Sequence, residues 1–187
     1  MLRTNQNFLD YIQKLYDKQN HKDNIILNSY KKGENLFLQG QKAIKIMIIK
    51  SGISKCYFFE ENNKEYILEF LGKGEIIGEI EAVKKVECLC SVQAVMDVQV
   101  FQLSAPYFNE LLNTDIYFNR LLIETFSDRI INTSSRASYQ QLFNSEKSLT
   151  KLLALLSQQK MKVSKEDMSA YLGISLRSLN RLLKKLN

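Results

Sequence analysis

Residues 162–186 read KVSKEDMSAYLGISLRSLNRLLKKL, and this stretch decides how the C-terminal part of the chain folds. Ser164 suits the N-cap of a first helix, because its hydroxyl can accept a hydrogen bond from the opening turn. Gly173 suits a left-handed helix end followed by a tight turn. Ser175 can cap a second helix, which carries leucines at helical spacing. The stretch therefore predicts a helix-turn-helix.

The outward face of the second helix is polar and basic. Its outward positions are Leu176, Arg177, Ser178, Asn180, Arg181 and Lys184. Such a face suits a DNA groove, which is rich in hydrogen-bond acceptors and lined by phosphates. The alternative is a basic pair of helices that binds an acidic protein partner, in which case the chain is a dimeric ligand-binding or scaffold protein.

The net charge of the chain is concentrated in this same region. Residues 145–187 hold nine Lys or Arg and three Asp or Glu, which gives the whole net charge of +6, while residues 1–144 sum to zero. Evenly mixed surfaces do not segregate charge in this way. The pattern favours a polyanion-binding part joined to a neutral part with another task.

Glycines divide the first half of the chain into short strands. Six of the seven glycines fall between residues 33 and 78. Short β-rich runs between turn glycines predict an antiparallel β-roll of the jelly-roll kind, preceded by a short helix at Phe8–Tyr16. The predicted strand runs are Ile44–Ile49, Lys55–Phe59, Tyr66–Leu71, Ile76–Ile77 and Ser91–Leu103. The fold class is therefore α+β.

One long helix is predicted from Asp115 to about Phe143, where neither glycine nor proline occurs. One stripe suits packing on the roll and comprises Phe118, Leu121, Leu122 and Thr125. A second stripe has spacings of three and four, the pattern of a coiled-coil seam, so we expect a homodimer there. The alternative is a helix buried between two layers. The predicted dimer interface is Ile123, Phe126, Ile130, Thr133 and Ala137.

A domain boundary is expected at Asn144 and Ser145, which offer an N-cap for a further helix through Leu149–Leu156. We therefore expect a sensor β-roll domain at residues 1–114, a dimerisation helix at 115–143 and a helix-turn-helix DNA-binding domain at 144–187.

Composition limits the classes of function. The one histidine, His21, sits in a polar run that indicates the surface. This scarcity argues against metal-hydrolase, Ser-His-Asp and cupin-type enzyme sites, which depend on imidazole. No apolar run is long enough for a membrane span, and the N-terminus lacks the apolar core of a signal peptide. We expect a cytoplasmic protein that is not an enzyme and holds no metal or cofactor.

The order of these parts resembles the CRP/FNR family of bacterial transcription regulators. The resemblance covers nearly the whole chain and rests on KGENLFLQG at 32–40, IIKSG at 48–52, FLGKGEIIGE at 70–79 and LGISLRSLNR at 172–181. The stretches GEIE at 78–81 and AYLG at 170–173 are most similar to the YeiL-type branch. The resemblance implies a homodimer on the long helix, a cyclic-nucleotide-binding-like roll as sensor, double-stranded promoter DNA as ligand and RNA polymerase as a further partner.

The resemblance also implies roles within the helix-turn-helix. Positions that match Leu176, Arg177 and Arg181 face base edges in the family. The positions that lie near phosphates match Ser164, Lys165, Ser175 and Ser178. Leu176 departs from this pattern, because it can contact only a thymine methyl or a sugar edge. The family continues into a β wing, whereas the sequence given stops at Asn187, so we expect the wing to be absent or truncated. The expected DNA-binding residues are Ser164, Lys165, Ser175, Leu176, Arg177, Ser178, Arg181 and Lys184.

The effector pocket implied by the resemblance lacks one part. Cyclic-AMP-binding members place Gly-Glu and then Arg-Ser in the roll, and the arginine pairs with the cyclic phosphate. Here the Gly-Glu pair is present, but the Arg-Ser position falls on Cys88 and Leu89. A buried phosphate without a cation is poorly compensated, so we expect no response to cyclic nucleotides. The expected pocket residues are Gly78, Glu79, Cys88, Leu89, Thr133 and Ser134.

The three cysteines are Cys56, Cys88 and Cys90. Iron–sulfur members of the family use four, mostly near the N-terminus, so that cofactor is not expected. Cys88 and Cys90 share one side of a strand if the strand is regular. They are either a redox or metal pair or small buried core residues, because free cysteine packs as a hydrophobe. The effector is therefore left as an unknown small molecule or a redox signal.

Overall fold

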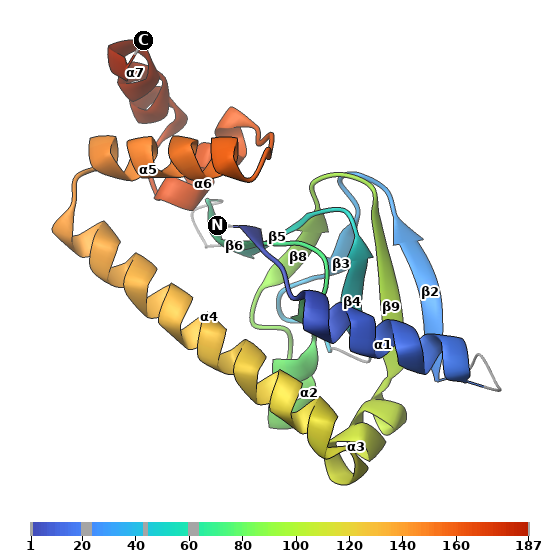
Figure 1. The fold of residues 1–187 in the computed structure, drawn as a ribbon. Helices are drawn as coiled ribbons and strands as arrows, with labels where there is room; N and C mark the ends of the chain where they lie inside the picture. Colours follow the sequence, from blue (N-terminus) through green and yellow to red (C-terminus); the bar gives the residue numbers. More distant parts are fainter. Residues whose placement is uncertain (1, 20–23, 43–44, 60–63, 187) are drawn as a thin grey trace.

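The structure, a computed structural model, describes residues 2–19, 24–42, 45–59 and 64–186. Its N-terminal half is a β-roll of two sheets, and a long helix connects the roll to three C-terminal helices (Figure 1). One sheet has the strand order β1-β6-β5-β8-β3, and the other has the order β2-β9-β4-β7. The strands are β1 (Leu2–Arg3), β2 (Ile25–Tyr30), β3 (Asn35–Phe37), β4 (Lys45–Ser51), β5 (Ser54–Phe59), β6 (Glu65–Leu71), β7 (Ile76–Ile77), β8 (Ser91–Ala94) and β9 (Val98–Ser104).

Paired apolar side chains on one face of the second sheet form part of a buried hydrophobic core. Ile46 and Ile48 of β4 lie opposite Leu103 and Phe101 of β9 in antiparallel register. All four are buried, with at most 1% of each exposed. Residues two apart on a strand share a face, so this register places the four side chains on one side of the sheet. The α+β fold class predicted from the glycine spacing is confirmed.

The predicted β-rich run Ser91–Leu103 is not one continuous strand. It forms β8 and β9, which lie in different sheets. The chain bends between them at a turn fixed by Asp97, which accepts hydrogen bonds from Lys31 Nζ at 2.9 Å and from the Lys32 backbone nitrogen at 3.0 Å. Strands β1, β2 and β3 and helix α2 (Glu79–Lys84) were not predicted from the sequence.

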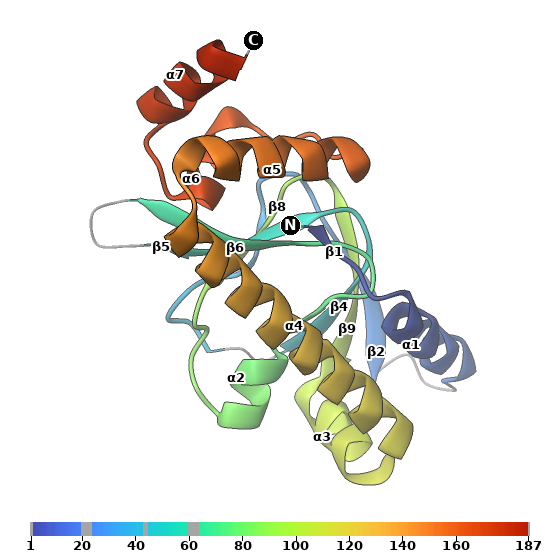
Figure 2. The ribbon, with the colours of Figure 1, turned by 60° about the vertical axis from the view of Figure 1, so that its left-hand side comes forward.

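Three helices cover the face of the β2-β9-β4-β7 sheet that carries Ile46, Ile48, Phe101 and Leu103 (Figure 2). Helix α1 (Gln6–Lys18) starts at Asn5, whose side chain accepts a hydrogen bond from the Phe8 nitrogen at 3.0 Å. Helix α3 (Ala105–Thr114) starts at Ser104 in the same manner. The rings of Phe8, Phe108 and Phe118 meet edge to face between these helices and the next one. The short helix predicted at Phe8–Tyr16 is confirmed as α1.

The long helix is α4 (Ile116–Leu142), with 27 residues and Asp115 as its N-cap. Its predicted roll-facing residues Phe118, Leu121, Leu122 and Thr125 are buried. Most of the second stripe faces solvent in the single chain, where Ile123 is 64% exposed and Ile130 is 66% exposed, but Phe126 is partly buried and packs against the core. The exposed positions of the stripe are therefore not covered by any described part of the chain.

The three C-terminal helices, here called the head, are α5 (Ser145–Gln158), α6 (Lys165–Leu172) and α7 (Leu176–Leu186). Each predicted cap is present. Asn144 accepts a hydrogen bond from Lys147, and Ser164 accepts one from the Asp167 nitrogen at 3.0 Å. Gly173 ends α6 with φ of 67°, a left-handed conformation. The predicted helix-turn-helix is thus formed by α6 and α7.

The head packs on the first sheet through α5 and α6, while α7 lies at the far end, away from the roll (Figure 1). Lys55 of β5 bonds Asp167 of α6 at 2.9 Å and Glu65 of β6 at 2.7 Å. Burial alone would lower the pKa of Lys55, but the hydrogen bonds to the two carboxylates raise it. The apolar cluster beneath comprises Tyr57, Ile67, Phe70, Leu152, Met161 and Tyr171.

Two predictions fall outside the described residues: the surface position of His21 and the start of the first strand run at Ile44. Within the described ranges, no helix is both long enough and apolar enough to span a membrane.

Candidate effector pocket and nucleic-acid interface

A cavity of 520 Å³ lies between the first sheet, α2 and the middle of α4. Five of the six predicted effector residues line it, and they come from segments far apart in the sequence. These residues are Gly78, Glu79, Leu89, Thr133 and Ser134. Most of the remaining wall is apolar, with side chains such as Phe37, Leu71 and Ile77.

Gly78 forms the tight entry into α2 beside this cavity. Its φ is 88°, and a Cβ at this position would lie 2.7 Å from the backbone oxygen of Lys45. A side chain would therefore be strained by both conformation and contact. The glycine lets the chain place Glu79 at the start of α2 with its carboxylate inside the protein.

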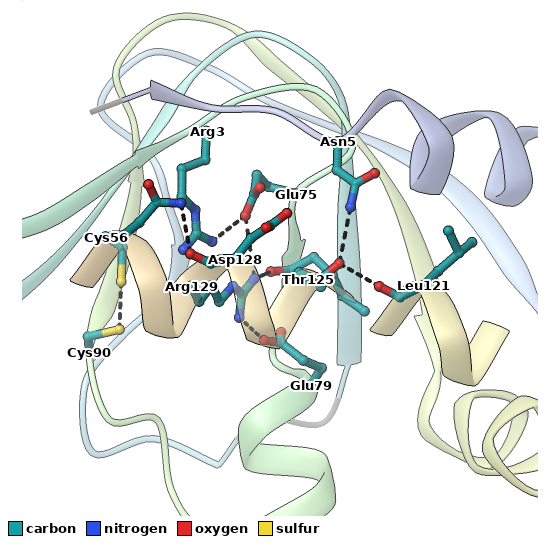
Figure 3. Close-up of polar contacts among 12 residues, drawn as sticks. Arg3, Asn5, Cys56, Glu75, Glu79, Cys90, Leu121, Thr125, Asp128 and Arg129 are labelled. Atoms are coloured by element: carbon teal, nitrogen blue, oxygen red, sulfur yellow. Dashed lines mark hydrogen bonds and ion pairs between the residues drawn. The ribbon is translucent and has the colours of Figure 1, made fainter. Parts of the chain in front are cut away.

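Two arginines and two glutamates form a compensated charge cluster at the cavity (Figure 3). Arg3 pairs with Glu75, and Arg129 of α4 pairs with Glu79 and lies 3.5 Å from Glu75. Arg129 also donates to the backbone oxygen of Ile76 at 2.5 Å. Burial raises the pKa of Glu79, and Arg129 acts against this rise. Both guanidinium groups are therefore committed to internal partners.

A third arginine, Arg136, connects α4 to the first sheet and to the head. It donates to the backbone oxygens of Leu68, of Ile67 at 2.9 Å and of Tyr171 at 2.5 Å. Its guanidinium carbon lies 3.9 Å from the centroid of the Tyr171 ring, a cation–π contact. Burial raises the pKa of the Tyr171 phenol to about 12, against the effect of Arg136. One side chain thus contacts all three parts of the chain.

Neither Arg129 nor Arg136 was predicted as a site residue. They continue the roll-facing stripe of α4, because Leu122, Thr125, Arg129 and Arg136 recur at helical spacing. That periodicity is the sequence signal by which Arg129 and Arg136 could have been identified as inward-facing. A charged residue on an inward face indicates a buried partner, but the sequence does not tell which one.

Cys88 and Cys90 do not share one side of a strand, and Cys88 fits the alternative of a small buried core residue. Residues 88–90 are not part of a strand, because β8 begins only at Ser91. Cys88 is 4% exposed and packs in the core, where burial raises its pKa to about 11, and it does not line the cavity. Cys90 and Cys56 do line it, and their sulfurs lie 2.8 Å apart (Figure 3). In the described part of the chain, no three His, Cys, Asp or Glu side chains are grouped to hold a metal ion.

The eight residues predicted to bind DNA all lie on the head. Arg177, Arg181 and Lys184 are exposed on α7. Ser175 accepts a hydrogen bond from the Ser178 nitrogen at 3.1 Å, and Lys165 donates to Asn180 at 3.3 Å. The remaining two predicted residues, Ser164 and Leu176, are also exposed, and Leu176 is 39% so.

The predicted dimer stripe and the predicted pocket share part of α4. Ile130, Thr133 and Ala137 line the cavity and also belong to the exposed stripe. A molecule in the cavity would therefore lie next to whatever covers the stripe.

Comparison with known proteins gives consistent matches. Residues 27–115 match the family model of the cyclic nucleotide-binding domain. The chain is 23% identical over 171 residues to the cAMP-activated global transcriptional regulator CRP of Salmonella typhimurium, covering 86% of this chain and 81% of that protein. It is 22% identical over 163 residues to electron transport regulator A of Shewanella oneidensis, covering 81% of this chain and 65% of that protein.

Solved structures share the fold. The c-di-GMP responsive global regulator CLP of Xanthomonas campestris superposes with a TM-score of 0.80 at 20% identity, covering 95% of this chain and 90% of that one. FixK2 from Bradyrhizobium japonicum superposes with a TM-score of 0.74 at 17% identity, covering 87% and 84%. The chain therefore contains a match to the cyclic nucleotide-binding domain at residues 27–115, and its overall fold is that of CLP and FixK2.

Proposed function

We propose that this protein is a DNA-binding regulator that recognises a near-palindromic promoter site as a homodimer and does not respond to cyclic AMP. The observation that carries the proposal is the placement of α7, whose arginines are exposed at the end of the molecule away from the roll. The net charge of the chain is concentrated on this same head. The protein would act in the cytoplasm and bind promoter DNA. RNA polymerase, which acts on the same DNA, would be a further partner.

Base recognition is assigned to α7. Arg177 and Arg181 are four residues apart, so they share one helical face and can both reach the major groove. Each can give a bidentate contact to guanine, worth about 1–3 kcal/mol of discrimination. Lys165, Lys184 and the serines at the helix starts supply contacts to the phosphates, which position the helix without reading sequence.

The exposed stripe of α4 is assigned to the homodimer. Pairing of two helices through Ile123, Phe126 and Ile130 removes apolar surface from water, which favours association. Two copies of α7 would then lie about one DNA turn apart, roughly 34 Å. We retain the three functional segments 1–114, 115–143 and 144–187 as part of this proposal.

We assign control of DNA binding to a ligand in the cavity, because the cavity and the exposed stripe share residues of α4. A ligand that contacts Thr133 and Ala137 can change how the two α4 helices pair, and hence the spacing of the α7 helices. The coupling needs a ligand with different affinity for the two arrangements. The charges in the cavity indicate the chemistry of this ligand.

A cyclic nucleotide does not fit the charge of this cavity. Arg3 and Arg129 are already paired with Glu75 and Glu79, and Leu89 stands where the phosphate-binding part is expected. Most of the rest of the cavity wall is apolar, with side chains such as Phe37, Leu71 and Ile77. We therefore expect a largely apolar, uncharged effector. Micromolar binding of cyclic AMP or cyclic GMP in calorimetry would contradict this part.

Selection of binding sites from a random duplex library tests the function itself. The purified full chain is expected to enrich a two-fold symmetric site whose half-sites each contain guanine, and the binding constant should fall steeply with salt concentration. A protein that enriches no duplex, and whose head captures an acidic protein instead, would be the scaffold protein considered as the alternative.

A further inference from the structure

Two of the three cysteines form a close pair in the wall of the cavity. Cys56 lies on β5, and Cys90 lies just before β8, the strand that pairs with β5. Their sulfur atoms are 2.8 Å apart, and both side chains are half-buried. The third cysteine, Cys88, is buried in the core of the roll and lines no part of the cavity.

The backbone already holds the two sulfurs in position. Cys56 lies opposite Val92 in the antiparallel β5–β8 register, and Cys90 is two residues before Val92. A disulfide bond is about 2.05 Å long, so the sulfurs need to approach by less than about 1 Å. Both cysteines also line a cavity large enough for a small oxidant. The pair is thus both near and reachable.

We infer that Cys56 and Cys90 are a reversible oxidation site, which a peroxide converts to an intramolecular disulfide in the cavity wall. One thiolate attacks a peroxide oxygen, the O–O bond breaks, and a sulfenic acid and hydroxide form. The second thiolate attacks that sulfur, the S–S bond forms, and a second hydroxide leaves. The two protons from the thiols convert both hydroxides to water, and the peroxide takes up the two electrons.

In the reduced protein Cys56 is held as a thiol. The hydrogen bond with Cys90, and then burial, raise the pKa of the Cys56 thiol well above its usual value. A protonated thiol is a poor nucleophile, so Cys56 does not make the first attack. We assign that attack to Cys90 and the resolving step to Cys56, whose proton leaves as the S–S bond forms.

The cysteine pair lies next to residues that contact the head, so disulfide formation can affect the position of the head. Cys56 follows Lys55 on β5, and neighbouring residues of a strand face opposite sides. The amine of Lys55 bonds Asp167 of α6 at 2.9 Å, while Cys56 faces the cavity. On the other side, the amide of Leu89, next to Cys90, donates to Glu81 of α2 at 3.2 Å. A bond between the sulfurs therefore joins two segments that contact α6 and α2.

Peptide mapping after oxidation tests the site without reference to DNA. The full chain is treated with hydrogen peroxide, free thiols are alkylated, and the digest is analysed by mass spectrometry without reduction. We expect a peptide pair linked through Cys56 and Cys90, lighter by two hydrogens and separated by dithiothreitol, with Cys88 alkylated only after unfolding. A link through Cys88, or oxidation to sulfinic acid without any link, would overturn the inference.

Variants supply the controls. Cys88→Ala removes the third thiol and should leave the linked pair intact, whereas Cys56→Ser and Cys90→Ser should each abolish it. If Cys88→Ala also abolished the link, the assignment would be wrong. The effect on the head rests on the proposed function and is read from affinity for the selected duplex before and after oxidation. A linked pair in a protein that binds no duplex would refute the function and leave the oxidation site standing.

Discussion

Arg136 of α4 lies over the ring of Tyr171 of α6, with its guanidinium carbon 3.9 Å from the ring centroid and a hydrogen bond of 2.5 Å to the Tyr171 backbone oxygen. The same guanidinium donates to two backbone oxygens of β6. In addition, Tyr171 stacks on Phe70 of β6, with ring centroids 5.8 Å apart. The head is therefore held on the roll by a side chain from the helix that joins them.

Arg136→Met is expected to loosen the head. Hydrogen bonds from a charged donor contribute about 1.5–3 kcal/mol, and Met keeps the apolar contact but none of the bonds. Amide protection in α6, measured by hydrogen exchange, should fall at least about tenfold, since about 1.4 kcal/mol corresponds to a factor of ten. Arg120→Met is the matched control, because Arg120 is exposed on the same helix. Equal protection in both variants would contradict this role.

Arg181→Ala and Lys165→Ala should affect DNA binding in different ways. Arg181→Ala should remove about 1–3 kcal/mol of preference for the selected site over a site with a changed guanine, because a base contact is lost. Lys165→Ala should weaken all duplexes nearly equally and reduce the salt slope by about one, because a phosphate contact is lost. Fluorescence anisotropy on both duplexes separates the two effects. Wild-type behaviour of both variants would show that the head binds DNA through another face.

Ile130→Asp should prevent dimer formation. In the proposed dimer its carboxylate would be buried without a partner, which costs several kcal/mol, so the dissociation constant should rise at least about hundredfold. Ile131→Asp is the matched control, because Ile131 is 63% exposed, close to the 66% of Ile130, and lies off the predicted seam. Sedimentation equilibrium measures both. A monomeric Ile131→Asp variant with a dimeric Ile130→Asp variant would move the interface to another face of α4.

Asp115→Ala should destabilise the fold by about 1 kcal/mol, because the N-cap of α4 is lost. The hydrogen bond from the Tyr11 hydroxyl, 2.6 Å long, lowers the pKa of Asp115 in the folded state. The contribution of Asp115 is therefore complete above the ordinary carboxyl pKa of about 4 and is lost as pH falls through the lowered value. Urea unfolding of the variant and the wild type should show a difference at pH 7 that narrows in acid. A difference that widened in acid would contradict the sign of this shift.

The parts that were predicted from the sequence depend on local signals. The caps Asn144, Ser164 and Gly173 each act within a few residues, so the helices they bound could be recognised without knowing the fold. The two stripes of α4 are likewise set by the 3.6-residue period of one helix. The pocket residues Gly78 and Thr133 were found through the family resemblance rather than through spacing.

The parts that were missed depend on contacts between distant segments. The parallel pairing of β1 with β6 joins Arg3 to Leu71, and no local pattern in two residues indicates it. The neighbour of Cys90 is Cys56, 34 residues away, because the chain leaves strand geometry at residues 88–90. The partners of Arg129 were equally hidden, since burial of a charge requires a counterion but does not name it.

The mass of the protein–DNA complex tests the central claim most directly. Sedimentation equilibrium of the full chain with a duplex carrying the selected site, in dilute salt, is expected to give two chains for each duplex. A single chain for each duplex, or a protein that stays monomeric and leaves the duplex free, would contradict the account.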